Sequence, residues 1–304
     1  MQFLIYQASR RGARKNNEDR LGYSYSKEAL LMVLADGMGG HLHGEIAAEI
    51  AVQSITQAFQ REAQPKLADP YRFLTDAITL AHLAIIGFAA ARQLPETPRT
   101  TCVACIVQDG AAYWAHVGDS RLYLIRDGRI EAVTKDHSRV QMLVDAGRVR
   151  PEAMLNHPER NKIFNCLGQL HPPRIDVARK TNLLHGDTVY LCSDGFWGPL
   201  PPALVVDTLQ HKDILKAVPE LIGAAEVRAG NEGDNVSIVA MSWQDASQAA
   251  DGGVSTEAMA GRNHETHLVL AGVAAGMHTA SVFTDEDILS PIDEIRSIAD
   301  KTQP

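Results

Sequence analysis

The chain has 304 residues, of which 45% are hydrophobic and 22% are charged, and its formal net charge is -8. This length and composition predict one sizeable globular domain plus an additional segment. The N-terminus has no basic flank before an apolar stretch, and no run of 18 apolar residues occurs, so we expect a cytoplasmic protein that does not span a membrane. Four cysteines within apolar runs exclude a disulfide framework.

The negative charge is concentrated in the C-terminal part of the chain. Residues 1–244 carry 26 lysines and arginines against 27 acidic residues, whereas residues 245–304 carry 3 against 10. A near-neutral region without a basic block lacks the electrostatic footprint of a nucleic-acid-binding protein. We therefore expect no nucleic-acid partner.

Short apolar runs typical of β-strands recur along the chain. In chain order they are Phe3–Gln7, Ala29–Ala35, Thr101–Val107, Ala111–Val117, Arg121–Ile125, Thr188–Cys192 and Val236–Met241. Asp109-Gly110 and Asp127-Gly128 each follow one of these runs, where a two-residue turn requires the positive φ that Asp and Gly tolerate. These pairs predict antiparallel hairpins in the middle of the chain.

Helical periodicity occurs in separate blocks. Apolar residues at three- to four-residue spacing extend from Ile46 to Phe59 and from Leu74 to Phe88, and the pattern returns over Val140–Val144 and Ile214–Val227. Because strands and helices are segregated, we predict an α+β fold. In it, antiparallel sheets pack as a sandwich flanked by helices.

The composition changes after Trp243 to Ala, Ser, Gly, Asp and Glu, which is typical of a linker. We therefore expect Val236–Met241 to be the last strand of a domain over residues 1–244. Residues 245–304 are then interpreted as an acidic linker and tail.

The tail contains an apolar run, Leu268–Met277, that is too short to span a bilayer. Ser290 as N-cap and Pro291 at the first position predict a short helix over residues 291–300. The tail is either a loosely attached terminus or a regulatory segment. In the second case its acidic stretch Thr284–Glu294 would compete with substrate, or its helix would dock on a partner.

Four aspartates lie where predicted strands begin or end. Asp36 and Asp194 each end a strand and precede a glycine, Asp119 lies at a strand junction, and Asp234 comes just before the last strand. One Asp-Gly pair is first of all a turn signal, but here the pattern repeats. A layered β fold can bring such ends to one rim, where carboxylates repel unless cations lie between them. Hard oxygen ligands favour magnesium or manganese, and a pair of such ions suits hydrolysis of a phosphate ester.

The segment Gly12–Asp19 supplies a group that could hold a phosphate. Arg14 offers a fork-shaped guanidinium, and Glu18, four residues on, offers a carboxylate able to hydrogen-bond metal-bound water.

In the order and spacing of its motifs the chain resembles the PPM family, the type 2C metal-dependent serine/threonine protein phosphatases, in a bacterial form. The resemblance covers about residues 5–242 and is carried by Gly12–Asp19, Ala35–His41, Thr100-Thr101, His116–Arg121, Lys135–Ser138, Leu167-Gly168, Leu191–Gly195 and Asp234-Asn235. It implies two antiparallel sheets flanked by helices. It also implies hydrolysis of phosphoserine and phosphothreonine in proteins by metal-activated water, without a covalent phosphoenzyme, in reversal of serine/threonine kinase signalling.

The resemblance further implies the metal ligands. Asp36 would bridge two Mn²⁺ or Mg²⁺ ions, and the Gly37 carbonyl, Asp194 and Asp234 would complete their shells. Asp119, together with Asp194, would hold a more weakly bound third ion.

Other groups near the metals also receive roles from the resemblance. Arg14 would bind the phosphate and Glu18 would act through water. Residues 138–168 correspond to a flap beside the site, whose cations either meet a phosphopeptide or are ordinary surface charges: Arg139, Arg148, Arg150, Arg160 and Lys162.

The sequence departs from some eukaryotic members at one position. These members have a histidine directly after the metal-bridging Asp-Gly, proposed as the acid that protonates the leaving group, whereas this chain has Met38. His41, His137 or metal-bound water remain as candidates for the general acid.

Other function classes fit less well. A cysteine phosphatase needs an arginine six positions after the cysteine, and those positions hold Gln108, Ala111, Pro172 and Gly198. A non-catalytic phosphoprotein-binding module predicts a missing metal ligand or a missing Arg14, and a two-metal nuclease predicts a basic surface. We therefore expect a monomeric enzyme whose partners are phosphorylated proteins, including a serine/threonine kinase and its substrates.

Overall fold

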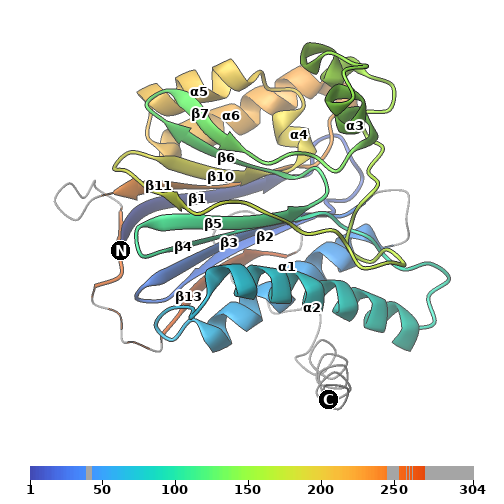
Figure 1. Ribbon diagram of the computed structural model, residues 1–304. Coiled ribbons are helices and arrows are strands. Elements are labelled where there is room, and N and C mark those ends of the chain that lie inside the picture. The colour runs from blue at the N-terminus through green and yellow to red at the C-terminus, as the bar shows by residue number, and fades with distance from the viewer. Residues whose placement is uncertain (39–42, 245–252, 258, 260, 262, 271–304) are drawn as a thin grey trace.

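The computed structural model describes residues 1–38, 43–244, 253–257, 259, 261 and 263–270. Within these ranges the strands form two antiparallel sheets that pack face to face, with helices on both outer faces (Figure 1). The predicted α+β sandwich is confirmed. His41, the acidic stretch 284–294 and the short helix expected over 291–300 lie outside the described residues.

The first sheet has its N-terminal strand near one edge. From edge to edge it contains β12 (Val254–Ser255), β1 (Gln2–Arg10), β11 (Val236–Gln244), β10 (Thr188–Cys192), β6 (Arg121–Arg126) and β7 (Arg129–Val133). Asp127 and Gly128, both with positive φ, form the turn between β6 and β7, as predicted.

The second sheet faces the first across the core. From edge to edge it contains β13 (Glu265–Val269), β2 (Asp19–Tyr25), β3 (Ala29–Asp36), β4 (Cys102–Gln108), β5 (Ala111–Val117) and β8 (Asp176–Val177), and β9 (Thr181–Asn182) also pairs with β5. Asp109 and Gly110, again with positive φ, form the predicted turn between β4 and β5.

Helices cover the outer face of each sheet. The α-helices are α1 (Gly44–Glu62), α2 (Pro70–Ala91), α3 (Arg139–Asp145), α4 (Asp194–Trp197), α5 (Pro202–His211) and α6 (Ile214–Ala229), and short 3-10 helices span Pro151–Asn156 and Gly230–Glu232. In Figure 1, α1 and α2 lie along the second sheet, and α5 and α6 lie on the first. By length and composition α2 resembles a membrane span, but its apolar side packs against α1 and the second sheet.

Three apolar layers result from strands that are buried on both faces. In β3, Leu31 and Val33 pack against α1 and α2, whereas Leu30, Met32 and Leu34 point between the sheets. A third cluster joins the outer face of the first sheet to α5 and α6. The rigid sandwich that results holds the strand ends in fixed positions around one rim.

The expectation that Val236–Met241 is the last strand is wrong. β12 pairs with β1 and β13 pairs with β2, so residues beyond 244 add an edge strand to each sheet. Thr256, which is fully buried, accepts a hydrogen bond from the Met1 ammonium group at 2.8 Å and donates one to the Lys27 carbonyl. These short polar strands form because the exposed edges of β1 and β2 offer unpaired backbone groups.

Candidate metal centre

Several strand ends meet around one open cavity of about 540 Å³. All seven residues predicted for the site from the sequence line this cavity: Arg14, Glu18, Asp36, Gly37, Asp119, Asp194 and Asp234. They come from the β1–β2 loop, the end of β3, the β5–β6 turn, the start of α4 and the loop before β11. The fold therefore brings together groups that are up to 220 positions apart in the chain.

Asp36 is fixed at the end of β3 by two threonines. Its N–H donates to Thr101 Oγ1 at 3.1 Å, and its carbonyl accepts from Thr100 Oγ1 at 2.8 Å. A Cβ added to Gly37 would lie 2.5 Å from the Gly44 carbonyl oxygen, so only glycine fits there. The backbone that carries Asp36 is thus held rigidly at the wall of the cavity.

Asp194 and Asp234 are brought together by a close approach of two loops. A Cβ added to Gly195 would lie 2.1 Å from the Asn235 carbonyl oxygen, so the loops can pack this closely only around a glycine. The same applies to Gly12, which has a φ of +61° and whose added Cβ would lie 2.1 Å from the Asp234 carbonyl oxygen.

Asn235 joins this pair of loops to the β1–β2 loop. Its Oδ1 accepts a hydrogen bond from the Glu18 N–H at 2.8 Å, and its Nδ2 donates to the Arg11 and Asn16 carbonyls at 2.8 and 2.9 Å. Asn235 therefore positions Glu18, although the sequence analysis gave it no role.

Arg14 lies at the mouth of the cavity with 54% of its side chain exposed. Its Nη2 donates to Asp234 Oδ2 at 2.5 Å, and this hydrogen bond is the main cause that raises the pKa of Arg14. Because a guanidinium has five N–H donors, Arg14 can contact Asp234 and still offer donors to an anion at the mouth.

Asp19 is a buried acid next to Asp36 that does not line the cavity and that the sequence analysis did not single out. It pairs in register with Asp36 across β2 and β3, is only 1% exposed, and accepts a hydrogen bond from Ser193 Oγ at 2.8 Å. The sequence could have pointed to Asp19 only through its position directly after Glu18, a predicted site residue. The strand that it begins was not predicted, because Gly22 and Ser24 interrupt its apolar pattern.

Burial and mutual repulsion make these carboxylates hard to ionise. Burial first, then the nearby Asp194 and Asp234, raise the pKa of Asp19 to about 7, and burial followed by Asp234 raises that of Asp194 to about 6. The pKa values of Asp36 and Asp119 are raised well above 3.8, by burial and then by neighbouring aspartates. A cation among these groups would remove the repulsion.

The donor set fits a hard divalent cation. Every acidic group named here offers carboxylate oxygen, which suits magnesium and manganese. Among the described residues, Asp19 Oδ1 and Glu18 Oε2 are buried without a hydrogen-bond partner. Such orphaned acceptors are costly unless an ion or ordered water meets them.

His137 and the four cysteines do not line the cavity. Met38 lines it, whereas His137 is only 2% exposed and is not part of its wall. All four cysteines are free and buried, and burial raises the pKa of Cys102 to about 12 and that of Cys166 to about 11. A buried thiol with a raised pKa is a poor nucleophile, in agreement with the exclusion of cysteine chemistry.

The structure distinguishes the cations of the flap. Arg139 and Lys162 both pair with Glu159, each at 2.9 Å, which makes them part of a surface ion network. Arg160 instead lines a second cavity of about 470 Å³ that shares Arg14 with the first.

A two-sheet sandwich with acidic strand ends and an arginine around one cavity is an arrangement suited to binding divalent cations and an anion, and comparisons with known proteins specify the family. The sequence model of protein phosphatase 2C matches residues 6–229. The serine/threonine protein phosphatase PstP of Mycobacterium tuberculosis is 32% identical over 268 residues, which are 88% of this chain and 49% of that protein. The chain thus spans about half the length of this relative. A putative protein phosphatase 2C-type of Streptococcus pyogenes is 31% identical over 74% of this chain and 92% of its own length.

Solved structures agree with the sequence comparison. The crystal structure of the Mycobacterium tuberculosis phosphatase PstP/Ppp has a TM-score of 0.70 and 32% identity, covering 81% of this chain and all of that one. The catalytic domain of PstP in complex with two manganese ions has a TM-score of 0.66 and 31% identity, covering 80% and 100%. The chain belongs to the protein phosphatase 2C family, the metal-dependent serine/threonine protein phosphatases, and the family predicted from the motifs is confirmed.

Proposed function

We propose that the chain removes phosphate from phosphoserine and phosphothreonine in proteins, with the cavity at the strand ends as the catalytic centre. The observation that carries this proposal is the convergence of the seven predicted residues on one cavity, where burial and mutual repulsion raise the pKa values of Asp36, Asp119 and Asp194. Asp36, the Gly37 carbonyl, Asp194 and Asp234 would hold two Mn²⁺ or Mg²⁺ ions.

The bound ions would supply Lewis acidity toward the phosphoryl oxygens and lower the pKa of a water molecule. Arg14 would bind the phosphate at the cavity mouth, where its guanidinium already meets the carboxylate of Asp234. Glu18 would act through water, and Asp119 with Asp194 would hold a third, weaker ion. Asp19, which lies opposite Asp36 in the neighbouring strand, would add negative charge and so strengthen cation binding.

The second cavity would receive the peptide around the phosphoresidue. It is continuous with Arg14 and is lined by Arg160 from the flap, Arg228 from α6, and apolar groups that include Met154 and Trp197. It also contains Glu232 and shares Asp194 and Asp234 with the first cavity, and this mixture of cationic, acidic and apolar groups suits a peptide chain that extends beyond the phosphate.

We infer a cytoplasmic, monomeric enzyme with no nucleic-acid or membrane partner that reverses the action of a serine/threonine kinase on its substrates. The phosphatase domain, expected over residues 1–244, would extend to about residue 270, since β12 and β13 complete both sheets.

Peptide hydrolysis by Arg14 variants tests the substrate class. We expect turnover of phosphoserine and phosphothreonine peptides in manganese, with KM raised at least 10-fold in Arg14→Ala and only partly restored in Arg14→Lys, because lysine lacks the planar fork. Arg11→Ala, which alters a neighbouring arginine of the same loop, is the matched control. Equal KM values for Arg14→Ala and Arg11→Ala would refute the phosphate-binding role.

A further inference from the structure

The turn between β5 and β6 that carries Asp119 is fixed by close packing and by hydrogen bonds. Gly118 has a φ of +105°, and a Cβ there would lie 2.6 Å from Thr101 Cγ2, so this position requires glycine. The Ser120 and Thr101 hydroxyl oxygens lie 2.7 Å apart, and Trp197 Nε1 donates to the Asp119 carbonyl at 3.0 Å. The direction of the Asp119 carboxylate therefore depends on what holds this short backbone segment.

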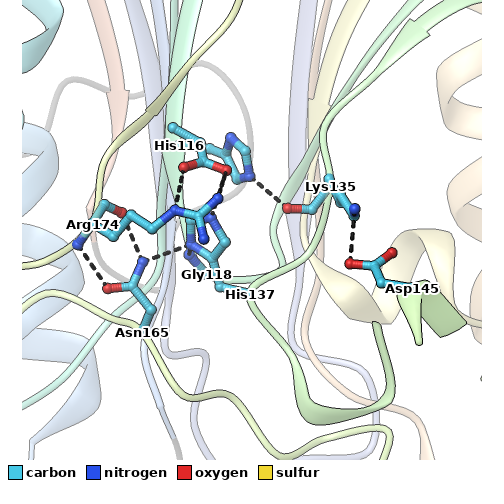
Figure 2. Close-up of polar contacts among 8 residues, drawn as sticks. His116, Gly118, Lys135, His137, Asp145, Asn165 and Arg174 are labelled. Atoms are coloured by element: carbon cyan, nitrogen blue, oxygen red, sulfur yellow. Dashed lines mark hydrogen bonds and ion pairs between the residues drawn. The ribbon is translucent and has the colours of Figure 1, made fainter. Parts of the chain in front are cut away.

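His137 contacts the same turn through hydrogen bonds to Gly118 (Figure 2). Its backbone N–H donates to the Gly118 carbonyl at 2.9 Å, and its Nδ1 accepts from the Gly118 N–H at 3.2 Å. The backbone N–H and the carbonyl of Gly118, the residue directly before Asp119, are thus both hydrogen-bonded to His137. Since His137 is only 2% exposed, water does not compete for these bonds.

The neighbours of His137 determine where its proton lies. Asn165 Oδ1 accepts from the Arg174 N–H at 3.0 Å, which orients the amide so that Nδ2 donates to His137 Nδ1 at 2.6 Å. With two donors facing Nδ1, the ring carries its proton on Nε2. That nitrogen lies 3.2 Å from Asp176 Oδ2, and Asp176 is held in turn by two hydrogen bonds from Arg174, at 2.7 and 2.9 Å.

The same proton argues against a second metal centre here. His116, His137 and Asp176 have potential ligand atoms within 4.8 Å of one another. A metal needs the lone pair of His137 Nε2, but that lone pair is absent when Nδ1 accepts hydrogen bonds from Gly118 and Asn165. His116 already donates through Nε2 to the Lys135 carbonyl at 2.8 Å and stacks on the His137 ring. The cluster is therefore a hydrogen-bonded support.

We infer that His137 is a positioning residue that orients Asp119 toward the weaker cation, acting through its hydrogen bonds to Gly118. The inference rests on the proposed role of Asp119. His137 also links this turn to the base of the flap, because its carbonyl accepts from the Phe164 N–H at 3.1 Å and the next residue, Ser138, caps α3 with its hydroxyl. The flap and the Asp119 turn thus share one anchor.

Two substitutions of His137 separate the two sides of its ring. Asparagine places Oδ1 near the position of Nδ1, so His137→Asn keeps an acceptor for the Gly118 N–H and loses the Nε2–H donor that lies 3.2 Å from Asp176 Oδ2. Glutamine places its amide near Nε2, so His137→Gln keeps that donor and loses the acceptor. Manganese binding to the full chain is measured by titration calorimetry, with the melting temperature of the metal-free protein recorded in parallel.

We expect His137→Gln to weaken the weakest manganese site at least 10-fold while the tighter sites change less than 3-fold, and His137→Asn to change all sites less than 3-fold. Equal losses of weak-site affinity in both variants, or a lowered melting temperature with unchanged manganese affinity, would overturn the inference. Asp119→Asn tests the underlying assignment: if it leaves the weak site unchanged, the proposed role of Asp119 fails. If it removes that site and His137→Gln does not weaken it, only the positioning role fails. Zinc binding that requires both His116 and His137 would contradict the proton assignment.

Discussion

Replacing Asp19 by asparagine is expected to stabilise the metal-free protein and to weaken its binding of manganese. Asp19 is only 1% exposed, and burial followed by the nearby Asp194 and Asp234 raises its pKa from 3.8 to about 7. At pH 8 the cost of keeping this group ionised in the folded state is therefore about 4 kcal/mol. Asparagine removes the charge and keeps an acceptor for the Ser193 hydroxyl.

Because neighbouring acids share this repulsion, we expect a gain of about 1–4 kcal/mol in the free energy of unfolding, or at least about 2 °C in melting temperature. The penalty is absent below the unfolded pKa of about 4 and present in full above about 7. Metal-free wild-type protein should therefore become more stable as the pH falls from 8 to 5. Asp19→Asn should show a flatter pH profile.

The assay is thermal unfolding in a chelator from pH 5 to pH 8, followed by manganese titration of both proteins. Asp187→Asn is the matched control, since Asp187 is equally buried but accepts two hydrogen bonds from Arg126, at 2.9 and 2.6 Å. That variant breaks a favourable pair and should lose about 3 kcal/mol. A metal-free Asp19→Asn protein that is less stable than wild type at pH 8, or that binds manganese as tightly, would refute the reasoning.

Three further changes have clear expected outcomes. Gly195→Ala should lower manganese-dependent turnover at least 100-fold, because its Cβ would lie 2.1 Å from the Asn235 carbonyl oxygen, and near wild-type kinetics would contradict this. Truncation after residue 244 should lower the free energy of unfolding by about 2–4 kcal/mol, because it exposes the edges of β1 and β2 to water. An unchanged melting temperature would show that β12 and β13 contribute little. Arg160→Ala should raise KM for a phosphothreonine peptide but not for p-nitrophenyl phosphate; equal effects on both would exclude a peptide contact.

Much of the fold was predictable because local chemistry and final structure agree. The strands of the core have continuous apolar runs, and the two Asp-Gly turns adopt the positive φ that their residue types allow. The metal-site residues could also be predicted from the sequence, because Asp36 and Asp194 end strongly apolar strands, and these strand ends lie at the same rim of the sandwich. Their proximity depends only on which strand ends meet.

The elements that were not predicted depend on contacts distant in the chain. β13 has the sequence Glu-Thr-His-Leu-Val, and it is a strand because β2 offers a free edge and Tyr23 stacks on His267. Asp19 gains its importance from Asp36, which lies opposite it in a neighbouring strand. Neither the free edge of β2 nor the pairing of Asp19 with Asp36 can be inferred from the local pattern of residues.

On the proposed function, the acids around Asp36 bind the divalent cations on which phosphate ester hydrolysis depends. The most direct measurement is manganese titration of the metal-free chain, combined with hydrolysis of a phosphothreonine peptide, for wild type and for Asp36→Asn. We expect two tight manganese sites and manganese-dependent turnover in wild type. In Asp36→Asn at least one tight site should be lost and turnover should fall at least 1000-fold, with the melting temperature of the metal-free protein maintained or raised. Wild-type turnover in the presence of a chelator, or in Asp36→Asn, would contradict it.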